Sequence, residues 1–439
     1  RSSSILLNFR YIKMKVYFFL LFLTALWCQV FTRSTKKTDD ASNHWAILVA
    51  GSNGYYNYRH QADICHAYHI VKNHGIPEDH IITMMYDDIA NNDDNPIKGN
   101  IINHPNGPNL YPGVVIDYRK DEVNPDTFIK VLEGNQTLKS QGKKVLESGP
   151  NDRVFVFFAD HGAPGLIAFP DDTLGARRLD KTLIKMHQDK RFKEMVLYVE
   201  ACESGSMFYN NLLPSDIKIL AVTAANPDES SYACYYDKKR GTYLGDLFSV
   251  NWMEDTDKHN INTETLIEQF KRVKQETNQS HVMMYGDKSY TNEPLADFQG
   301  TSDSLLATFT SFASKADAVP SRDVQIETLL RKMKDASTED ERYKHEEKLT
   351  EYIKKRDAIK DKVSKIEKEI FGFETVSLLK KKRQLKNFSC YESVVAELHK
   401  RCFNIGQEDE ARRLLYKFVN ICEVGVPVED TLRAIKKVC

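Results

Sequence analysis

The sequence predicts an α/β domain around a mostly parallel sheet, followed by an all-helical domain held by disulfides. From Trp45 onward, short apolar runs alternate with amphipathic helical patterns, which is typical of a parallel sheet flanked by helices. After residue 325 the chain becomes highly charged and helical in pattern, and Cys390, Cys402, Cys422 and Cys439 fall in its last 50 residues. At 439 residues the chain is long enough for two folded units.

The apolar runs are the predicted strands, and they cover residues 45–50, 81–86, 153–159, 195–200 and 217–223. A crossover helix is predicted over residues 63–74, because apolar side chains recur there at three- and four-residue spacing before Gly75 and Pro77. A later helix is predicted over residues 263–277. The stretch 91–125, rich in Asn, Gly and Pro, is predicted to be a long functional loop.

The second half begins with a linker, predicted over residues 301–324, where Ser, Thr, Ala and Pro320 replace the regular patterns. Residues 325–439 then form the predicted helical domain, with four-residue apolar spacing from Ile326 and a second amphipathic region after Cys390. The preceding domain is predicted to span residues 44–300.

The N-terminal region predicts entry into the secretory pathway. Met14 and Lys15 precede a short apolar run over residues 16–27, which favours a signal peptide over residues 14–30 rather than a membrane anchor. Residues 1–13 are then upstream sequence and residues 31–43 a short propeptide. Three Asn-x-Ser/Thr sequons, at Asn135, Asn278 and Asn387, agree with this compartment. No second apolar stretch of membrane length occurs, so no span is expected in the mature protein.

The cysteine count predicts at least one unpaired thiol. Without Cys28 seven cysteines remain, an odd number in a compartment that permits disulfides. The four near the C-terminus are expected to form two bridges. The unpaired thiol is therefore sought among Cys65, Cys202 and Cys234, of which Cys65 and Cys234 are predicted to be buried and inert.

The charge distribution excludes some partners and favours another. The formal net charge of −1 argues against nucleic-acid binding. Residues 44–300 carry a net charge of −10 and residues 325–439 a net charge of +5. Domains of opposite sign attract each other, so the helical domain is expected to be a partner of the first domain and to lie over it.

Two predicted strands end at residues that could carry covalent chemistry. Residues 153–159 lead into Asp160-His161-Gly162, and residues 195–200 lead into Ala201-Cys202. Sites in open α/β sheets lie beyond the carboxyl ends of the strands. A neighbouring imidazole can take the proton of a thiol and make it a nucleophile. His161 and Cys202 are therefore the candidate base and nucleophile, with the amides of Gly162 and Cys202 as oxyanion donors.

The order of these residues and the motifs around them resemble one family. Histidine precedes cysteine, each after its own strand, as in caspase-like rather than papain-like peptidases. Residues 44–300 resemble the legumains, or asparaginyl endopeptidases. The matching stretches are Ala50-Gly51-Ser52-Asn53-Gly54, Asn57-Tyr58-Arg59-His60-Gln61-Ala62-Asp63, Met85-Tyr86-Asp87-Asp88-Ile89-Ala90, Asp160-His161-Gly162, Glu200-Ala201-Cys202-Glu203-Ser204-Gly205-Ser206, Ala224-Ala225-Asn226-Pro227 and Glu229-Ser230-Ser231-Tyr232-Ala233-Cys234-Tyr235-Tyr236.

The resemblance implies a caspase-like six-stranded sheet with helices on both faces, and a cysteine endopeptidase that cuts after asparagine, and after aspartate at lower pH, through a thioester. It implies an autoinhibited zymogen, no cofactor, cystatin-type inhibitors as further partners, and passage to a lysosome, vacuole or digestive compartment, or secretion. A thioester can also be attacked by an amine, so peptide ligation is a second expected outcome. Carried over to this sequence, the resemblance makes Asn57 the residue that orients His161.

The resemblance also implies a pocket for the side chain before the scissile bond. Its residues would be Arg59, His60, Glu200, Ser231 and Asp246. An asparagine amide has a carbonyl acceptor and an NH2 donor, so its pocket needs a cation and a carboxylate. Arg59 supplies the first, and Glu200 or Asp246 the second. In the family the residue at Asp160 can cyclise to a succinimide, although a loop aspartate more often forms a turn.

Residues beyond the linker resemble the family's prodomain, less closely than the core does. The resemblance implies the pairs Cys390–Cys422 and Cys402–Cys439, whereas spacing alone leaves three pairings open. No asparagine occurs between Glu293 and Lys386, so an enzyme specific for asparagine would need an aspartate to release its tail. Asp335 is the predicted cleavage residue, with Asp323 as the second choice.

Two other functions remain open at this point. A subunit like that of the glycolipid-anchor transamidase would share the core, but the two-domain layout without a C-terminal membrane helix argues against it. A silent binding protein on the same fold would lack the nucleophile, whereas Asn57, His161 and Cys202 are all present. The neighbours Cys65, His66, His69 and His74 match no metal-ligand spacing, so no metal is expected.

Overall fold

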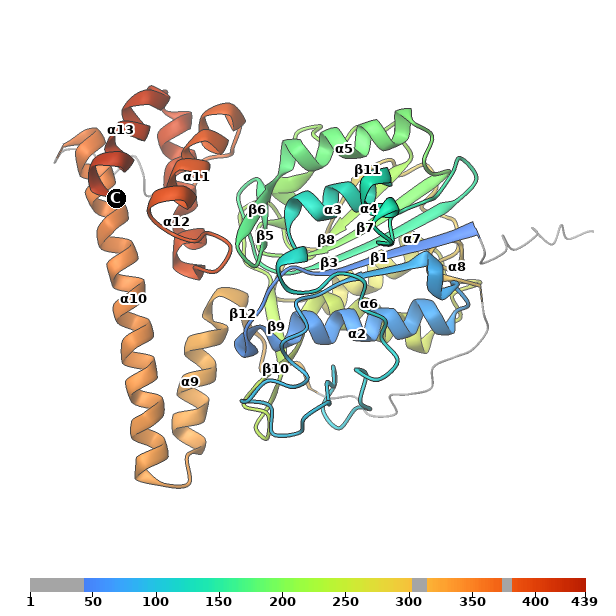
Figure 1. Cartoon of the computed structure of the whole chain (residues 1–439), viewed down its shortest axis with the longest axis horizontal. Coiled ribbons are helices and arrows are strands. Elements are labelled where there is room, and N and C mark those ends of the chain that lie inside the picture. Colours follow the sequence, from blue (N-terminus) through green and yellow to red (C-terminus); the bar gives the residue numbers. More distant parts are fainter. Residues whose placement is uncertain (1–42, 302–313, 373–380) are drawn as a thin grey trace, which may run out of the picture. The chain divides into compact units, whose positions relative to one another are not determined.

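A computed structural model describes residues 43–301, 314–372 and 381–439 (Figure 1). The predicted signal peptide, and the propeptide except for its last residue, lie outside the described residues. None of the described helices is long and apolar enough to cross a membrane.

The first domain contains a six-stranded sheet in the order β11-β8-β7-β3-β1-β2. Every pairing is parallel except that of β11 with β8. The predicted mostly parallel sheet is therefore confirmed. The strands are β1 (His44–Ala50), β2 (Ile81–Met84), β3 (Arg153–Ala159), β7 (Glu194–Glu200), β8 (Ile219–Thr223) and β11 (Met283–Gly286).

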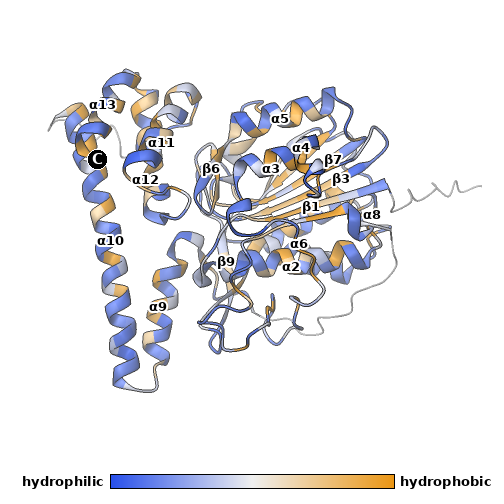
Figure 2. Ribbon diagram, in the orientation of Figure 1, coloured by the Kyte–Doolittle hydropathy of each residue, from blue (hydrophilic) through white to orange (hydrophobic). Residues whose placement is uncertain are grey.

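Alternate residues of the central strands face two different cores. Along β3, Val156 and Phe158 pack with helices α3 (Pro125–Leu132) and α5 (Ala176–Gln188), whereas Phe155 and Phe157 pack with α2 (Tyr58–Asn73) and α6 (Leu247–Lys258). Figure 1 shows these two pairs of helices on opposite faces of the sheet. Figure 2 shows the same strands as the most hydrophobic part of the fold. The predicted helices on both faces are therefore confirmed. The remaining helices of this domain are α4 (Gln136–Ser140), α7 (Leu266–Glu276) and α8 (Ala296–Gln299).

Two small sheets border the carboxyl ends of the central strands. One is antiparallel, in the order β10-β9-β12, and includes a strand from the predicted linker. The other is a meander in the order β4-β5-β6. Their strands are β9 (Tyr232–Asp237), β10 (Thr242–Asp246), β12 (Val319–Pro320), β4 (Gly162–Ala163), β5 (Leu166–Phe169) and β6 (Asp172–Gly175).

The described residues after β12 are helical, as predicted. The helices are α9 (Val324–Asp335), α10 (Glu339–Phe371), α11 (Phe388–Arg401), α12 (Asp409–Glu423) and α13 (Val428–Val438). Figure 2 shows a largely hydrophilic α10, and only Ile359, Val363 and Ile366 of this helix are buried. The disulfides Cys390–Cys422 and Cys402–Cys439 join α11 to α12 and the end of α11 to the end of α13. The family pairing is therefore confirmed.

Some predicted boundaries differ from the structure. Helix α2 begins at Tyr58, five residues before the predicted start at residue 63. Helix α6 and strand β11 were not predicted, and α7 is shorter than the helix predicted over residues 263–277. Cys65 and Cys234 are unpaired and buried, as expected.

Candidate active site

The parallel pairing of β3 with β7 brings the predicted base and nucleophile together. Ala159 is the register partner of Glu200, and the amide of Asp160 donates to the carbonyl of Glu200 at 3.0 Å. His161 follows Asp160 directly, and Cys202 lies two residues after Glu200. A Cβ atom added to Gly162 would lie 2.2 Å from the Cys202 carbonyl oxygen, so only glycine permits this close approach of the two chains.

His161 is held by a hydrogen bond to Asn57. Its Nε2 lies 2.9 Å from Asn57 Oδ1, while Asn57 Nδ2 donates to the carbonyl of Asn53 at 2.9 Å. Because an amide oxygen only accepts, neutral His161 carries its hydrogen on Nε2 and leaves a lone pair on Nδ1. Nδ1 is buried without a hydrogen-bond partner. Burial, followed by the charge of Arg412, holds the pKa of His161 well below its usual value.

Cys202 is fully buried, at the point where its segment meets the start of β9. Its Sγ lies 3.2 Å from Ser230 Oγ and 3.8 Å from Ser231 Oγ. Within the described residues, no hydrogen bond joins Cys202 to His161. Catalytic hydrogen bonds often form only once substrate is bound, so this arrangement agrees with an enzyme that is not yet engaged with a substrate.

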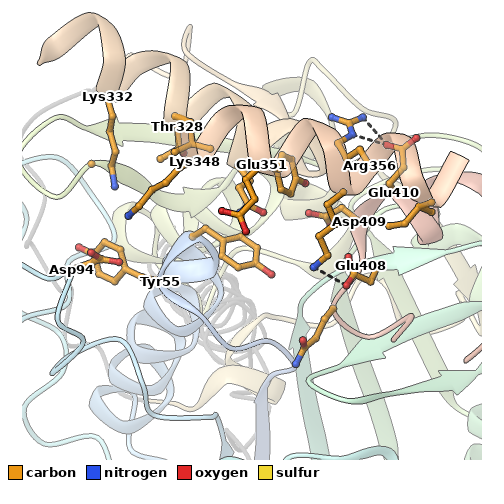
Figure 3. A pocket seen from close by; sticks show the side chains of 18 residues that line it. Tyr55, Asp94, Thr328, Lys332, Lys348, Glu351, Arg356, Glu408, Asp409 and Glu410 are labelled. Atoms are coloured by element: carbon orange, nitrogen blue, oxygen red, sulfur yellow. Dashed lines mark hydrogen bonds and ion pairs between the residues drawn. The ribbon is translucent and has the colours of Figure 1, made fainter. Parts of the chain in front are cut away.

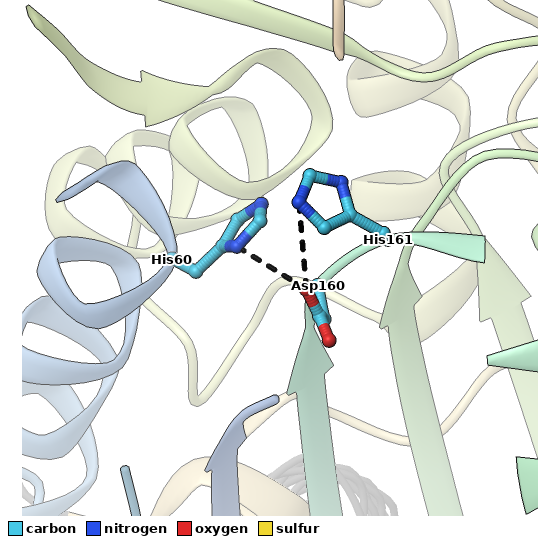
Figure 4. A group of neighbouring side chains, drawn as sticks. All are labelled: His60, Asp160 and His161. Atoms are coloured by element: carbon cyan, nitrogen blue, oxygen red, sulfur yellow. Dashed lines mark ion pairs between the residues drawn. The ribbon is translucent and has the colours of Figure 1, made fainter. Parts of the chain in front are cut away.

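Asp160 lies between two histidines (Figure 4). Its Oδ1 is 3.5 Å from His60 Nδ1 and 3.9 Å from His161 Nε2, and His60 Nδ1 is 2.6 Å from Ser52 Oγ. Burial raises the pKa of Asp160 well above its usual value. The three side chains offer ligand atoms within 4.8 Å of one another. One nitrogen of each ring is engaged in a hydrogen bond, in His161 with Asn57 and in His60 with Ser52. These hydrogen bonds explain the positions of the two histidines without a metal ion.

A second described group with metal-ligating side chains lies at the carboxyl end of α6. Asp255, His259 and Glu264 offer atoms within 4.8 Å of one another. Arg272 Nη1 lies 2.5 Å from Asp255 Oδ1 and also contacts Glu264. The guanidinium therefore supplies a positive charge at the place where a cation would bind.

The five predicted residues of the substrate pocket come together at the start of α2, the end of β7 and the end of β10. Arg59 Nε donates to Asp246 Oδ1 at 2.8 Å, and His60 Nε2 lies 3.4 Å from Asp246 Oδ2. Glu200 Oε2 accepts from the amide and hydroxyl of Ser249, at 3.1 and 3.0 Å. All of these side chains are buried. Burial, together with the neighbouring Asp246, raises the pKa of Glu200.

Three polar atoms of the five pocket residues are buried without a hydrogen bond. They are Arg59 Nη2, Glu200 Oε1 and Asp246 Oδ2. A buried group in this state costs about 1–3 kcal/mol, and more when the group is charged. The pocket therefore presents one unsatisfied donor and two unsatisfied acceptors. Asp246 pairs with Arg59 through its other oxygen, and its charge helps to raise the pKa of Glu200.

The end of the predicted linker lies along β9, next to Cys202. Val319 and Pro320 pair antiparallel with Ala233 and Tyr232. The register continues at Ser321, whose amide donates to the Ser231 carbonyl at 2.9 Å and whose Oγ lies 3.2 Å from Ser231 Oγ. This pairing places Ser321 in the pocket.

The next residue, Arg322, is buried beside the nucleophile. Its Nη1 donates to Glu203 Oε1 at 2.9 Å, and its Nη2 donates to the Gly162 carbonyl at 2.8 Å and contacts Glu203 Oε2. Burial opposes the charge of Arg322, but the Glu203 carboxylate raises its pKa above the usual value. Arg322 is therefore a charged group within the site.

The start of α12 also reaches the site, since α12 packs against β4. Asp409 Oδ1 lies 3.8 Å from His161 Nδ1. The buried Arg412 pairs with Asp409 and donates to the carbonyls of Ile405 and Gly406, at 2.6 and 2.5 Å. Both segments that touch the site thus belong to the C-terminal part of the chain.

A cavity of about 480 Å³ lies beside the start of α12 (Figure 3). It is lined by residues of α9 and α10 and by Tyr55 and Tyr56 of the first domain. Ion pairs connect α10 to the start of α12: Lys355 with Glu408 at 2.8 Å, and Arg356 with Glu410 at 2.7 Å. These pairs hold α10 against the turn that carries Asp409.

The other predicted positions are found as follows. Asn278 and Asn387 are exposed and Asn135 is half-buried. Asp335 ends α9 and lies 3.0 Å from Lys238. Asp323 lies 2.5 Å from Arg413. The predictions of glycosylation, of cleavage at these aspartates and of a succinimide at Asp160 stay predictions.

Several residues at the site were not predicted from the sequence: Glu203, Ser230, Ser249, Ser321, Arg322, Asp409 and Arg412. Glu203 and Ser230 lie within stretches that match the family, so their position was visible but their contacts were not. Ser321 and Arg322 stand in a segment whose composition is that of an ordinary linker. Only the pairing with β9 brings them to Cys202.

Comparison with known proteins agrees with this geometry. Residues 44–301 match the Peptidase C13 family, and residues 347–439 match the legumain prodomain. Legumain from Bos taurus is 45% identical over 408 residues, which cover 91% of this chain and 94% of the relative. Hemoglobinase from Schistosoma japonicum is 44% identical, with 92% and 95% covered. A vacuolar-processing enzyme from Vicia sativa is 38% identical over 440 residues, with 93% and 88% covered.

Caspase-1 from Spodoptera frugiperda is a structural match at a TM-score of 0.33 and 12% identity, covering 58% of this chain and 94% of that chain. This likeness is too slight to bear on the fold. The family match over most of the chain and the high coverage of the relatives decide the classification. The chain belongs to the peptidase C13 family and is a cysteine endopeptidase of the legumain type, joined to a legumain prodomain.

Proposed function

We propose that this endopeptidase cuts after asparagine, with Cys202 as nucleophile, His161 as base and Asn57 as the residue that orients His161. The single observation that carries the specificity is the set of unsatisfied atoms in the pocket, which are the donor Arg59 Nη2 and the acceptors Glu200 Oε1 and Asp246 Oδ2. An asparagine side chain would accept a hydrogen bond from the arginine and donate its NH2 hydrogens to the carboxylates. An apolar side chain would leave these buried groups unpaired, which costs far more than a lost contact.

The proposed reaction begins with transfer of the Cys202 proton to His161 Nδ1, the nitrogen without a hydrogen-bond partner. The thiolate attacks the backbone carbonyl carbon of the asparagine, and the amides of Gly162 and Cys202 stabilise the oxyanion. His161 returns the proton to the departing amine, and the C–N bond breaks to leave a thioester. Water, deprotonated by His161, then releases the acid and the free thiol. An amine in place of water would give a new peptide bond.

The precursor is proposed to be autoinhibited by two segments. The strand that ends at Ser321 occupies the pocket, and the start of α12 places Asp409 and Arg412 beside His161. Both would have to leave before a substrate could bind. The attraction between the two domains of opposite charge supports the same arrangement, and acidification that neutralises carboxylates weakens it.

The setting and partners follow from the family. Relatives are named hemoglobinase and vacuolar-processing enzyme. We propose that this chain acts on proteins and peptides in a lysosome, vacuole or digestive compartment, reached through the secretory pathway, and that cystatin-type inhibitors bind the same cleft. Residues 44–300 and 325–439 are the proposed peptidase domain and inhibitory prodomain.

The test uses the purified full-length precursor, activated at acidic pH. It is incubated between pH 4 and pH 7 with peptides that differ at one position, which is asparagine, aspartate, glutamine or serine, and the products are identified by mass spectrometry. Cleavage after asparagine is expected throughout the acidic range. Cleavage that ignores this position, or equal cleavage by a Cys202→Ala precursor treated in the same way, would contradict the proposal.

A further inference from the structure

We propose that Glu203 forms a subsite for a basic side chain directly after the scissile bond, so that the preferred substrates carry arginine after asparagine. This inference rests on the proposed cleavage after asparagine and adds the substrate class on the leaving-group side. It is carried by the contacts of Arg322 with Glu203 and with the Gly162 carbonyl.

The end of the linker pairs with β9 beside Cys202. Val319, Pro320 and Ser321 face Ala233, Tyr232 and Ser231 in one continuous antiparallel register. Ser231 belongs to the proposed asparagine pocket, and its hydroxyl is 3.8 Å from Cys202 Sγ. Ser321 therefore stands where the residue before the scissile bond would stand. The residue after that bond corresponds to Arg322.

Three hydrogen bonds and an ion pair receive the Arg322 guanidinium. Both carboxylate oxygens of Glu203 and the carbonyl of Gly162 accept from it. The two charged side chains are almost fully buried, with exposed fractions of 7% and 2%. A two-pronged contact with a carboxylate suits a guanidinium but not a single ammonium. The subsite is therefore expected to prefer arginine to lysine.

An unusual backbone conformation at Glu203 orients its carboxylate toward Arg322. Glu203 has a φ of 49°, in the left-handed region that residues other than glycine seldom adopt. Its amide donates to the Glu229 carbonyl at 2.7 Å, which holds this conformation. Strained residues of this kind persist where the surrounding structure requires them, often at functional sites.

Release of the prodomain, together with displacement of the linker, would leave Glu203 without its present partners. The second cation near it is Lys382, whose Nζ lies 3.6 Å from Glu203 Oε1. Lys382 follows both proposed cleavage residues, Asp323 and Asp335, and would leave with the prodomain, whereas Arg322 precedes them and would leave the site with Ser321 when a substrate displaces the linker. The carboxylate then faces the cleft next to Cys202, where an arginine of the substrate restores the lost pair.

The experiment measures kcat/KM of the acid-activated enzyme on four peptides that share one sequence and differ only after asparagine, with arginine, lysine, glutamine or glutamate there. Arginine is expected to exceed glutamine by about tenfold, in line with hydrogen bonds to a charged group, and glutamate to be the poorest. High salt should reduce the arginine preference, because part of it is an ion pair.

Two variants separate this subsite from general effects of charge. Glu203→Gln keeps the size of the side chain and should bring the arginine-to-glutamine ratio close to one. Glu147→Gln makes the same change at an exposed residue paired with Lys139 and should keep the ratio of the unchanged enzyme. If Glu203→Gln does not fold, the four-peptide series and its salt dependence in the unchanged enzyme still test whether the subsite prefers arginine.

Equal cleavage of all four peptides by the unchanged enzyme, or an undiminished arginine preference in Glu203→Gln, would overturn the subsite while leaving cleavage after asparagine intact. Failure to cut any of the four asparagine peptides would instead reject the proposed function, and the subsite with it. Residual cleavage in Cys202→Ala measures contaminating protease and is subtracted.

Discussion

At the scale of single residues, the surroundings of His161 link its charge to the closed state of the precursor. Burial and the cations Arg412, Arg59 and Arg322 lower its pKa. Two of these cations, Arg412 and Arg322, lie in segments that would leave the site on activation. Removing them should therefore raise the pKa of His161 toward the ordinary histidine value of about 6.5.

This difference predicts how acid affects the precursor. The open form binds a proton on His161 below about pH 6.5, whereas the closed form does not until the pH reaches its lowered pKa. The contribution of neutral His161 to the closed form is therefore fully present above pH 6.5 and is lost as the pH falls toward that lowered value. NMR titration of labelled histidine should give a higher pKa for His161 in the activated enzyme. An identical pKa in precursor and activated enzyme would contradict the link.

The nucleophile and base should respond to substitution as one unit. Cys202→Ala is expected to abolish cleavage, and His161→Ala to reduce kcat/KM by a factor of about 10³ or more, because each removes half of one proton-transfer pair. Cys65→Ala, at a buried unpaired thiol, is the control and should keep activity. The measurement is kcat/KM on an asparagine peptide, with circular dichroism to check the fold.

Aspartate before the scissile bond should be accepted only at lower pH. Its ionised carboxylate would be repelled by Glu200 and Asp246, whereas the protonated acid resembles the amide of asparagine. Rates on paired asparagine and aspartate peptides, measured from pH 4 to pH 7, should show the aspartate rate rising relative to the asparagine rate as the pH falls. Aspartate peptides cut best near pH 7 would rule out this pocket.

At the scale of elements, the pairing of β12 with β9 fixes what the linker presents to Cys202. Ser321 has a side chain too short to reach all the unsatisfied atoms of an asparagine pocket. Ser321→Asn should turn the linker into a substrate, so that the precursor is cut between residues 321 and 322 at a pH where the unchanged chain stays intact. N-terminal sequencing would show a fragment that begins at Arg322.

Ser321→Ala is the matched control for this change, because it alters the same position without supplying an amide and should remain uncut there. An intact Ser321→Asn chain, in a preparation that cuts asparagine peptides once activated, would show that the linker does not lie in a productive register.

The burial of each element explains whether it could be predicted from the sequence. β3 and β7 are buried on both faces and read as unbroken apolar runs. Helix α6 was missed because residues on nearly all of its sides are buried, so it lacks the one-sided pattern that reveals a surface helix. The start of α2 was missed because Arg59 and His60 are buried polar residues of the pocket. Local patterns fail at such functional positions. The placement of Ser321 depends on a pairing with β9, about 90 residues earlier in the chain.

At the scale of the whole molecule, release of the prodomain needs a cut that the sequence makes difficult. Asp335 ends α9 at a short turn before α10, and its side chain is partly exposed. Asp323 pairs with Arg413 beside the site. Asp335 therefore remains the first candidate for cleavage, because the bond after it is the more accessible to a second molecule of enzyme.

The precursor held near pH 4 should yield a new N-terminus at Ala336, and Asp335→Ala should slow its release. Asp340→Ala, at an exposed aspartate in the next helix, is the control and should be released normally. Unchanged kinetics of prodomain release and an unchanged cut position in Asp335→Ala would show that the cut is made after another residue or by a second protease.

The site is occupied by a strand of its own chain, and this sets how strongly a substrate must compete for it. Because Ser321 and Cys202 belong to the same polypeptide chain, the blocking segment is present at an effective concentration of about millimolar or more, whatever the dilution of the protein. Substrates at lower concentration cannot compete with it. A cut after Asp335 leaves this strand attached to the first domain, but it turns the contact of α12 with the site into a bimolecular one, so dilution then favours loss of the prodomain. The disulfides Cys390–Cys422 and Cys402–Cys439 hold the detached helices in one piece. The released prodomain can therefore bind again wherever enzyme and prodomain are concentrated together, and inhibition becomes a function of the volume in which they are confined.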